Sequence, residues 1–289
     1  MKVIKAKTAG FCFGVKRAVD TVYKQVDTKC GQIYTYGPII HNEEVIKDMR
    51  DKGVIVLRSE EDLDMISQGT VIIRSHGVEK RIYEKIEQKG LRIVDATCPF
   101  VKKIHNIVSE KSKEGFHIII IGNPEHPEVV GIKGWAKDNV TVIQSAEDAE
   151  CFTPDRKEKI CIVSQTTFNY NKFKDLVEIL CKKRYDNNVL NILNILNTIC
   201  NATEERQREA KNIAGEVDTM LVVGGRHSSN TQKLFEICKK ECGNTYYIQT
   251  PVDLDSEMFQ RSSFVGITAG ASTPKKIIEE VQEHVRIKF

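Results

Sequence analysis

The segment LRIVDATCPFVKKIHNIV at residues 91–108 places an apolar strand pattern, a cysteine and an amphipathic helix pattern in direct succession. The same order occurs in KVIKAKTAGFCFGVKRAV (residues 2–19) and in NILNTICNATEERQREA (residues 194–210). Cys98, Cys12 and Cys200 therefore each follow a predicted strand and precede a predicted helix. This recurrence indicates an α/β protein built from three similar units.

The agreement between the three segments continues downstream of each cysteine. Each helix pattern leads to an apolar strand that ends on glycine, at Gly37, Gly122 and Gly224, which lie 25, 24 and 24 residues after their cysteines. A second strand and another amphipathic helix follow in each unit. We predict three α/β lobes, at residues 1–96 with Cys12, 97–195 with Cys98 and 196–289 with Cys200.

Polar side chains gather where the predicted strands end. They are His41, His76, His126, Glu128, Thr166, Ser228, Ser229, Asn230 and Ser272. Parallel α/β sheets place ligand-binding groups at the carboxyl ends of their strands. Three lobes around a pseudo-threefold axis would turn these ends, and the three thiols, toward one central cavity. We therefore expect a trefoil arrangement with a metal centre in the middle.

Three thiolates supplied by separate units match neither the paired cysteines of a zinc ribbon nor the clustered run of a ferredoxin. They would suit three corners of a cubane iron–sulfur cluster whose fourth iron stays open to substrate. A three-cysteine zinc site remains the alternative metal. The other six cysteines are expected to be buried and structural: Cys30, Cys151, Cys161, Cys181, Cys238 and Cys242.

The remaining polar set is rich in hydrogen-bond donors, which predicts a pocket for a phosphate or diphosphate. Helix capping is the other interpretation for Ser228, Asn230 and Ser272, because Ser and Asn are common N-caps, and both roles can hold at once, since a cap points into the same cleft. Glu128 is the one carboxylate in these strand-end segments without a capping role. We expect it to be a proton donor, since burial beside an anion would raise its pKa.

The composition of the chain argues against two classes of binding partner, nucleic acids and membranes. The net charge of +3 comes from intermixed Lys, Arg, Asp and Glu without a basic stripe, so no nucleic-acid partner is expected. Residues 1–15 lack the apolar core of a signal peptide, and no stretch reaches the length of a membrane span. We therefore expect a cytoplasmic protein with no membrane partner.

The blocks in this sequence resemble those of the LytB family of 4-hydroxy-3-methylbut-2-enyl diphosphate reductases. They are AGFCFGVKRAV, GPIIHN, RSHGV, DATCPFV, GNPEHPEV, SQTT, TICNAT, GGRHSSNT and TAGAST. They occur in the family's order along nearly the whole chain. The resemblance implies a trefoil of three α/β domains around one [4Fe-4S] cluster. It also implies reductive removal of an allylic hydroxyl, which ends the non-mevalonate isoprenoid pathway.

The resemblance also implies roles for individual residues. Cys12, Cys98 and Cys200 would bind the cluster. His41, His76, Ser228, Asn230 and Ser272 would hold the diphosphate, with His126 on the substrate side. Glu128 would supply protons, and Thr166 with Ser229 would complete the polar network. A soluble ferredoxin or flavodoxin is the expected electron donor.

The sequence alone leaves two other functions open. A non-catalytic redox sensor could use the same three-cysteine cluster, but it would not need the phosphate-binding set or Glu128. A zinc-dependent hydrolase of a phosphorylated substrate is the third possibility. One departure from the family pattern is Asn197, which stands where we expect an aspartate, so the pattern does not fix the end of the strand before Cys200.

Overall fold

The computed structural model describes residues 1–28, 31–153, 155, 158–186, 193–260 and 262–288. Within these residues the strands form three four-stranded sheets, and all their strand pairs are parallel. The expectation of an α/β fold with three similar units is confirmed at this level. No helix in the described part of the chain is long and apolar enough to cross a membrane.

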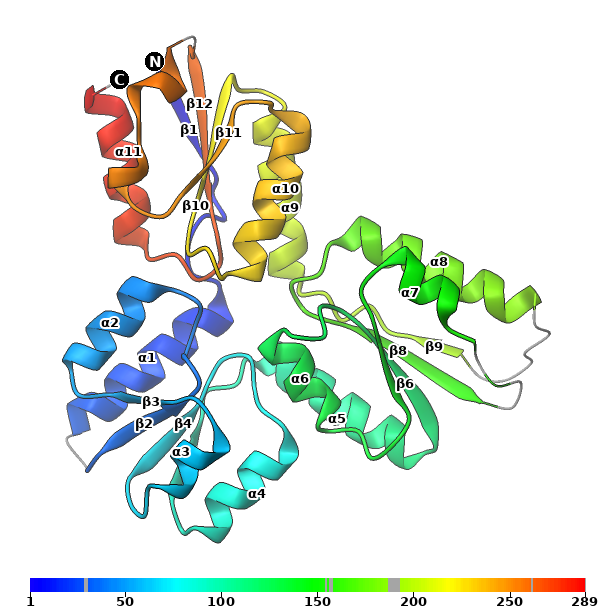
Figure 1. The fold of residues 1–289 in the computed structure, drawn as a ribbon. Coiled ribbons are helices and arrows are strands. Elements are labelled where there is room, and N and C mark those ends of the chain that lie inside the picture. The colour runs from blue at the N-terminus through cyan, green and yellow to red at the C-terminus, as the bar shows by residue number, and fades with distance from the viewer. Residues whose placement is uncertain (29–30, 154, 156–157, 187–192, 261, 289) are drawn as a thin grey trace. The chain divides into compact units, whose positions relative to one another are not determined.

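The three sheets share one strand order (Figure 1). Sheet B has the order β3-β2-β4-β5, with β2 (Ile33–Tyr36), β3 (Ile55–Leu57), β4 (Thr70–Ile73) and β5 (Arg92–Asp95). Sheet C has the order β7-β6-β8-β9, with β6 (Phe116–Ile121), β7 (Val140–Ile143), β8 (Lys159–Ser164) and β9 (Leu193–Ile195). Sheet A has the order β11-β10-β12-β1, with β1 (Lys2–Lys5), β10 (Thr219–Val223), β11 (Thr245–Ile248) and β12 (Phe264–Ala269).

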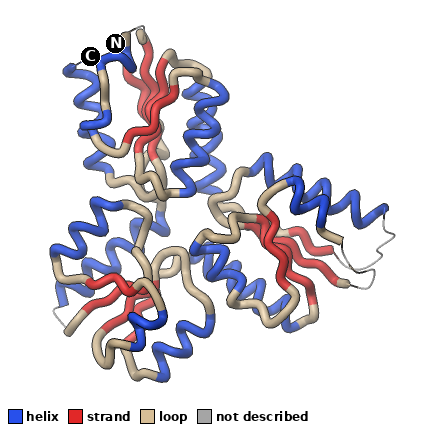
Figure 2. The backbone as a smooth tube through the Cα atoms, in the orientation of Figure 1, coloured by secondary structure: helices blue, strands red, loops and turns tan. Residues whose placement is uncertain are grey.

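Helices flank the sheets on both faces (Figure 2). In chain order they are α1 (Phe13–Thr28), α2 (Glu43–Asp51), α3 (Glu60–Asp64), α4 (Lys80–Gln88), α5 (Pro99–Lys113), α6 (Pro127–Lys133), α7 (Ala146–Cys151), α8 (Tyr170–Asp186), α9 (Asn201–Ala214), α10 (Ser229–Glu241) and α11 (Lys275–Lys288). Two 3₁₀ turns, η1 (Pro251–Asp253) and η2 (Ser256–Phe259), precede β12.

Strand β6 shows why these sheets are covered on both sides. Its isoleucines alternate between two cores: Ile119 and Ile121 pack with α7 and α8, whereas Ile118 and Ile120 pack with α5 and α6. A continuous apolar run of this kind is typical of a parallel strand buried on both faces. Sheet A is built in the same way, with α11 on one face and α9 and α10 on the other.

Contacts divide the chain into two compact units. The first comprises Met1–Asp20, Ile40–Lys52 and Asn201–Phe289 and contains sheet A. The second comprises Thr21–Ile39 and Gly53–Cys200 and contains sheets B and C.

The first strand corrects one expectation from the sequence. The prediction placed residues 2–5 in the first lobe, but β1 pairs with β12, in the register Lys2↔Phe264 to Lys5↔Ile267. Sheet B has Arg92–Asp95 at the equivalent edge. A strand pattern identifies a strand but not its partner, and the partner here comes from the far end of the chain.

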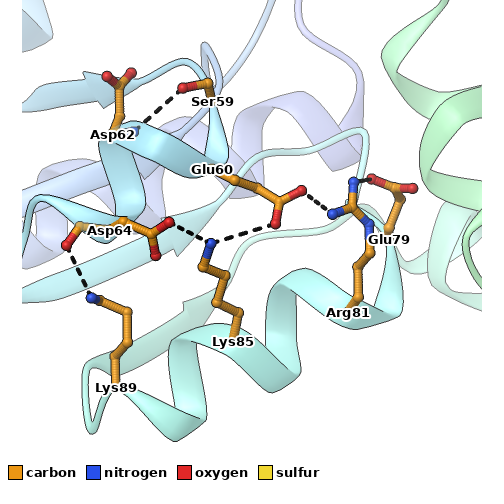
Figure 3. A network of polar contacts seen from close by, with 8 residues as sticks. All are labelled: Ser59, Glu60, Asp62, Asp64, Glu79, Arg81, Lys85 and Lys89. Carbon is orange, nitrogen blue, oxygen red and sulfur yellow. Dashed lines mark hydrogen bonds and ion pairs between the residues drawn. The ribbon is translucent and has the colours of Figure 1, made fainter.

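In the second unit, ion pairs between charged side chains link the short helix α3 to α4 (Figure 3). Glu60 pairs with Arg81 and Lys85, and Lys85 also lies 2.8 Å from Asp64. Ser59 caps α3 by accepting the N–H of Asp62 at 3.3 Å. Exposed ion pairs contribute little individually, about 0–1 kcal/mol each, so the network mainly orients α3.

Candidate functional site

The three repeated cysteines occupy equivalent local positions in the structure. Each follows an edge strand of one sheet and directly precedes the helix that leads to the next sheet, α1, α5 or α9. Each backbone N–H donates to a carbonyl in the loop after the neighbouring strand. The pairs are Cys12 to Ala271 at 3.3 Å, Cys98 to Ser75 at 2.9 Å and Cys200 to Thr166 at 3.0 Å. The repetition predicted from the sequence therefore extends to the hydrogen bonds.

The thiols of Cys12, Cys98 and Cys200 are half-buried and reduced. Cys98 is the N-cap residue of α5, with Pro99 in the first turn, and its side chain makes no capping hydrogen bond. A helix N-terminus carries a partial positive charge, which favours an anionic group. Three equivalent thiols at helix N-termini are a donor set that fits a cysteine-ligated iron–sulfur cluster.

The turn before each cysteine in the second unit is closed by a side-chain oxygen. Asp95 Oδ1 accepts the N–H of Thr97 at 3.0 Å, and Asn197 Oδ1 accepts the N–H of Ile199 at 3.1 Å. The two acceptors stand at the same distance in sequence from their cysteines. An amide oxygen accepts this bond as a carboxylate does, so Asn197 preserves the turn. The strand before it, β9, ends at Ile195.

The prediction that the other cysteines are buried holds for only part of the set. Cys161, Cys238 and Cys242 are buried, and burial raises the pKa of Cys161 to about 11 and of Cys238 to about 12. Cys181 is half-buried. The prediction is wrong for Cys151, which is exposed because it ends the short helix α7 at the surface. Cys30 lies outside the described residues.

Glu128 is a buried carboxyl group held by one partner residue. It lies in the first turn of α6, and only 1% of its surface is exposed. Its Oε1 accepts the backbone N–H of Thr166 at 2.6 Å, and its Oε2 accepts the Thr166 hydroxyl at 2.7 Å. Burial outweighs both hydrogen bonds and raises the pKa of Glu128 to about 7.

Two imidazoles lie close to this acid in sequence or space. His126 is the N-cap of α6, and its Nδ1 accepts the N–H of Glu128 at 3.1 Å. An acceptor Nδ1 assigns the proton of the neutral ring to Nε2, which is then a donor. The ring of His76 meets that of His126 edge-on, with centroids 5.5 Å apart. The second unit thus brings His76, His126, Glu128 and Thr166 into one region.

His76 is positioned by tight packing behind its loop. Gly77 has a φ of +69°, and a Cβ there would lie 2.4 Å from Cε1 of His105. His105 stacks on Trp135 with ring centroids 5.0 Å apart, and burial lowers the pKa of His105 to about 4. Trp135 donates its indole N–H to the carbonyl of Val78 at 2.9 Å. These contacts fix the backbone on the C-terminal side of His76.

The first unit gathers a second polar set. Ser272 donates to the carbonyl of His41 at 3.1 Å and lies 3.4 Å from the hydroxyl of Ser228. Ser228 is the N-cap of α10, whose first turn holds Ser229 and Asn230. Asn230 is 5% exposed, and within the described residues neither polar atom of its amide has a hydrogen-bond partner. A buried amide in this state suits a polar ligand.

These contacts show which of the three side chains caps a helix. Ser228 caps α10 by accepting the N–H of Thr231 at 3.3 Å. Asn230 lies inside the helix, and Ser272 is used for tertiary hydrogen bonds instead of a cap. Capping therefore explains Ser228 only.

Two charged residues of α9 were not singled out by the sequence patterns. Arg206 is 3% exposed and donates to the carbonyl of Ala269 at 2.6 Å. Glu209 accepts the backbone N–H groups of Lys7 and Thr8 at 2.8 and 2.9 Å. Six of the nine residues in the stretch TEERQREAK are charged, so the sequence carried no signal that these two side chains point inward.

The fold and the site define an α/β protein of three parallel sheets, with a cysteine in each connection between one sheet and the next. The LytB protein family model matches residues 3–286. The chain belongs to the LytB family.

Curated relatives and solved structures of high similarity agree with this membership. A 4-hydroxy-3-methylbut-2-enyl diphosphate reductase of Caldanaerobacter subterraneus subsp. tengcongensis is 47% identical, over 99% of this chain and 97% of that protein. The Clostridioides difficile protein of the same name is 44% identical, over 97% of this chain and 98% of its own length.

The solved structure of the E-1-hydroxy-2-methyl-but-2-enyl-4-diphosphate reductase from Plasmodium falciparum matches with a TM-score of 0.89 and 29% identity, covering 99% of this chain and 87% of that one. A solved (E)-4-hydroxy-3-methyl-but-2-enyl diphosphate reductase, described as the terminal enzyme of the non-mevalonate pathway, matches with a TM-score of 0.70 and 39% identity, covering 99% of both chains.

Proposed function

We propose that this chain is an oxidoreductase that converts (E)-4-hydroxy-3-methylbut-2-enyl diphosphate to isopentenyl and dimethylallyl diphosphate. Two electrons and two protons remove the allylic hydroxyl as water, which is the last step of the non-mevalonate pathway. Family membership and the names of the relatives support the reaction. The observation in the structure that carries it is the buried Glu128, bound at both oxygens to Thr166, whose carbonyl accepts the N–H of Cys200.

Cys12, Cys98 and Cys200 would ligate one [4Fe-4S] cluster per chain. When bound, the cluster would pass electrons from the donor to the substrate one at a time and would provide a Lewis-acidic iron. The equivalent hydrogen bonds of the three cysteines support this assignment, since they hold three thiols in matching local geometry. Because the chain has no flavin or nicotinamide motif, the electrons would come from a soluble ferredoxin or flavodoxin in the cytoplasm.

The substrate diphosphate would be bound by hydrogen-bond donors. His41, His76, Ser228, Asn230 and Ser272 are the proposed ligands, with Ser229 and His126 beside them. The unsatisfied amide of Asn230 and the N-terminus of α10, a helix of 13 residues, favour an anion at this place. The donor Nε2 of His126 would face the substrate.

Glu128 would deliver protons through Thr166. With the carboxyl protonated on Oε2, the short contact to the Thr166 hydroxyl can reverse its direction, so that Oε2 donates. The Thr166 hydroxyl can then pass its own proton to the departing oxygen while it accepts the proton of Glu128. A pKa of about 7 keeps a large fraction of Glu128 protonated at neutral pH, as a general acid requires.

The alternative, a non-catalytic redox sensor, would leave this buried acid without a purpose. An anaerobic assay with a chemical reductant and the diphosphate substrate tests the two functions against each other. Formation of both isoprenoid diphosphates supports the reductase. A chain that holds its cluster but forms neither product would support the sensor. The three lobes at residues 1–96, 97–195 and 196–289 remain a proposal, with β1 assigned to sheet A.

A further inference from the structure

Helix α9 begins directly after Cys200 and sends two charged side chains to other segments of the first unit. The carboxylate of Glu209 accepts three hydrogen bonds from two consecutive residues. Its Oε1 takes the N–H of Lys7 at 2.8 Å, and its Oε2 takes the N–H and hydroxyl of Thr8 at 2.9 and 2.5 Å. Hydrogen bonds to an ionised acceptor are among the stronger ones in proteins.

These bonds fall where the chain has left its sheet. The N–H of Ala6 makes the last hydrogen bond to strand β12, with the carbonyl of Ile267 as acceptor. Further along the chain, the N–H of Cys12 donates to the carbonyl of Ala271. Between them lies Gly10, with a φ of +108°, a conformation that favours glycine. Glu209 therefore anchors the segment that carries Cys12 midway between these two points.

Arg206, one turn earlier in α9, binds the end of β12, the strand that precedes the turn to which Cys12 is hydrogen-bonded. Its guanidinium donates to the carbonyl of Ala269, the last residue of β12. Two residues further on, Ala271 accepts the N–H of Cys12, and Ser272 follows it. The turn Gly270–Ser272 is thus shared between the Cys12 segment and the proposed diphosphate set.

We propose that Glu209 and Arg206 are positioning residues that fix the Cys12 segment against the turn Gly270–Ser272. The inference rests on the proposed function, because its consequence is the retention of a cluster by Cys12. A loosened Cys12 would exchange its iron more readily, while the other two ligands would be unaffected. Supporting residues around metal ligands commonly change metal affinity by about 10–100-fold.

Glu209→Gln tests the role of Glu209 most directly. The amide has one acceptor oxygen instead of two and turns an N–H donor toward the donors of Lys7 or Thr8. Release of iron from the anaerobically purified holoenzyme to a chelator should become roughly tenfold faster. Thr8→Val, which removes only the hydroxyl bond, should give a smaller acceleration, and Thr8→Ser should behave like the parent chain.

Two control variants on the same helix separate positioning from general effects. Glu205→Gln removes the same charge from an exposed side chain. Ile213→Val weakens the core beneath sheet A, in which Ala6 and Ala9 also pack, but it removes no hydrogen bond of the Cys12 segment. Both should release iron at the parent rate well below their melting temperatures.

Arg206→Lys tests the other half of the proposal. A lysine cannot reproduce the planar guanidinium, so the turn should shift. We expect faster iron release together with weaker binding of inorganic pyrophosphate, measured by calorimetry, whereas Glu209→Gln should leave pyrophosphate binding within about twofold, because it removes no contact of Ser272.

The outcomes distinguish this inference from the proposed function. If Glu209→Gln releases iron no faster than Ile213→Val, the positioning role is refuted while the cluster assignment stands. If the parent chain itself holds no cluster, the proposed function fails and the inference fails with it.

Discussion

Thr166 binds both oxygens of Glu128, giving its backbone N–H to Oε1 and its hydroxyl to Oε2 at 2.6 and 2.7 Å. The same residue accepts the N–H of Cys200 through its carbonyl. One threonine therefore joins the only buried strand-end acid predicted from the sequence to a proposed cluster ligand. This arrangement supports the proposed proton path from Glu128 through Thr166 and leads to the first two predictions.

Glu128→Gln should preserve the fold and abolish most of the turnover. The glutamine amide can accept the N–H of Thr166 and donate to its hydroxyl, so both contacts survive, but it cannot release a proton. We expect turnover to fall by about 10²–10⁴-fold, with cluster content and substrate affinity close to those of the parent. Steady-state kinetics combined with iron analysis measures both. Unchanged turnover would rule out the proton role of Glu128.

The activity should fall as the pH rises through about 7, where Glu128 loses its proton. Its folded-state pKa lies above the ordinary value of 4.5, so folding favours the protonated acid. The stability gained from that preference is present below the ordinary pKa and is lost as pH rises through 7. Unfolding curves at several pH values should therefore show a loss of stability between pH 4.5 and about 7 that Glu128→Gln lacks. A parallel pH dependence in both proteins would contradict the raised pKa.

Gly77→Ala should raise the KM for the diphosphate substrate. The added Cβ would strain a positive φ and collide with His105, displacing the loop of His76. Gly90→Ala is the matched control, because Gly90 has a φ of +68° but no atom within 4 Å of the place that a Cβ would occupy. Both should lose about 1 kcal/mol from backbone strain. Equal KM values in the two variants would show that the packing behind His76 does not position it.

Asn197→Asp should have almost no effect on cluster content or turnover. The aspartate Oδ1 can accept the N–H of Ile199 as Asp95 accepts that of Thr97. We expect cluster content and turnover within about twofold of the parent, whereas Asn197→Leu should lose the bond and about 1 kcal/mol of stability. Thermal unfolding and iron analysis of both variants provide the comparison. A large loss in the aspartate variant would mean that the amide has a role beyond closing this turn.

The sequence predicted the repeated local elements well because each depends on short-range periodicity. The helix after Cys98 is α5, and the strand before Gly37 is β2, as the patterns indicated. The partner of β1 could not be predicted in the same way, since pairing with β12 depends on packing between the two ends of the chain. The same limit applies to the exposure of Cys151, which follows from the position of α7.

The residue types of the candidate site could be predicted from the sequence, but the contacts between those residues could not. Glu128 was recognised as an acid in a strand-end segment, yet its partner Thr166 lies 38 residues away. Glu209 and Lys7 are 202 residues apart, and nothing in a run of charged residues marks the one that points inward. Such pairings are set by tertiary packing, which local spacing does not encode.

The central claim is that Cys12, Cys98 and Cys200 hold a catalytic iron–sulfur cluster. The most direct test is anaerobic purification, with iron and sulfide analysis and electron paramagnetic resonance of the reduced protein before and after addition of the diphosphate substrate. The account predicts about four irons and four sulfides per chain and a signal that changes when substrate binds. Zinc in place of iron, or a cluster signal that substrate leaves unchanged, would contradict it.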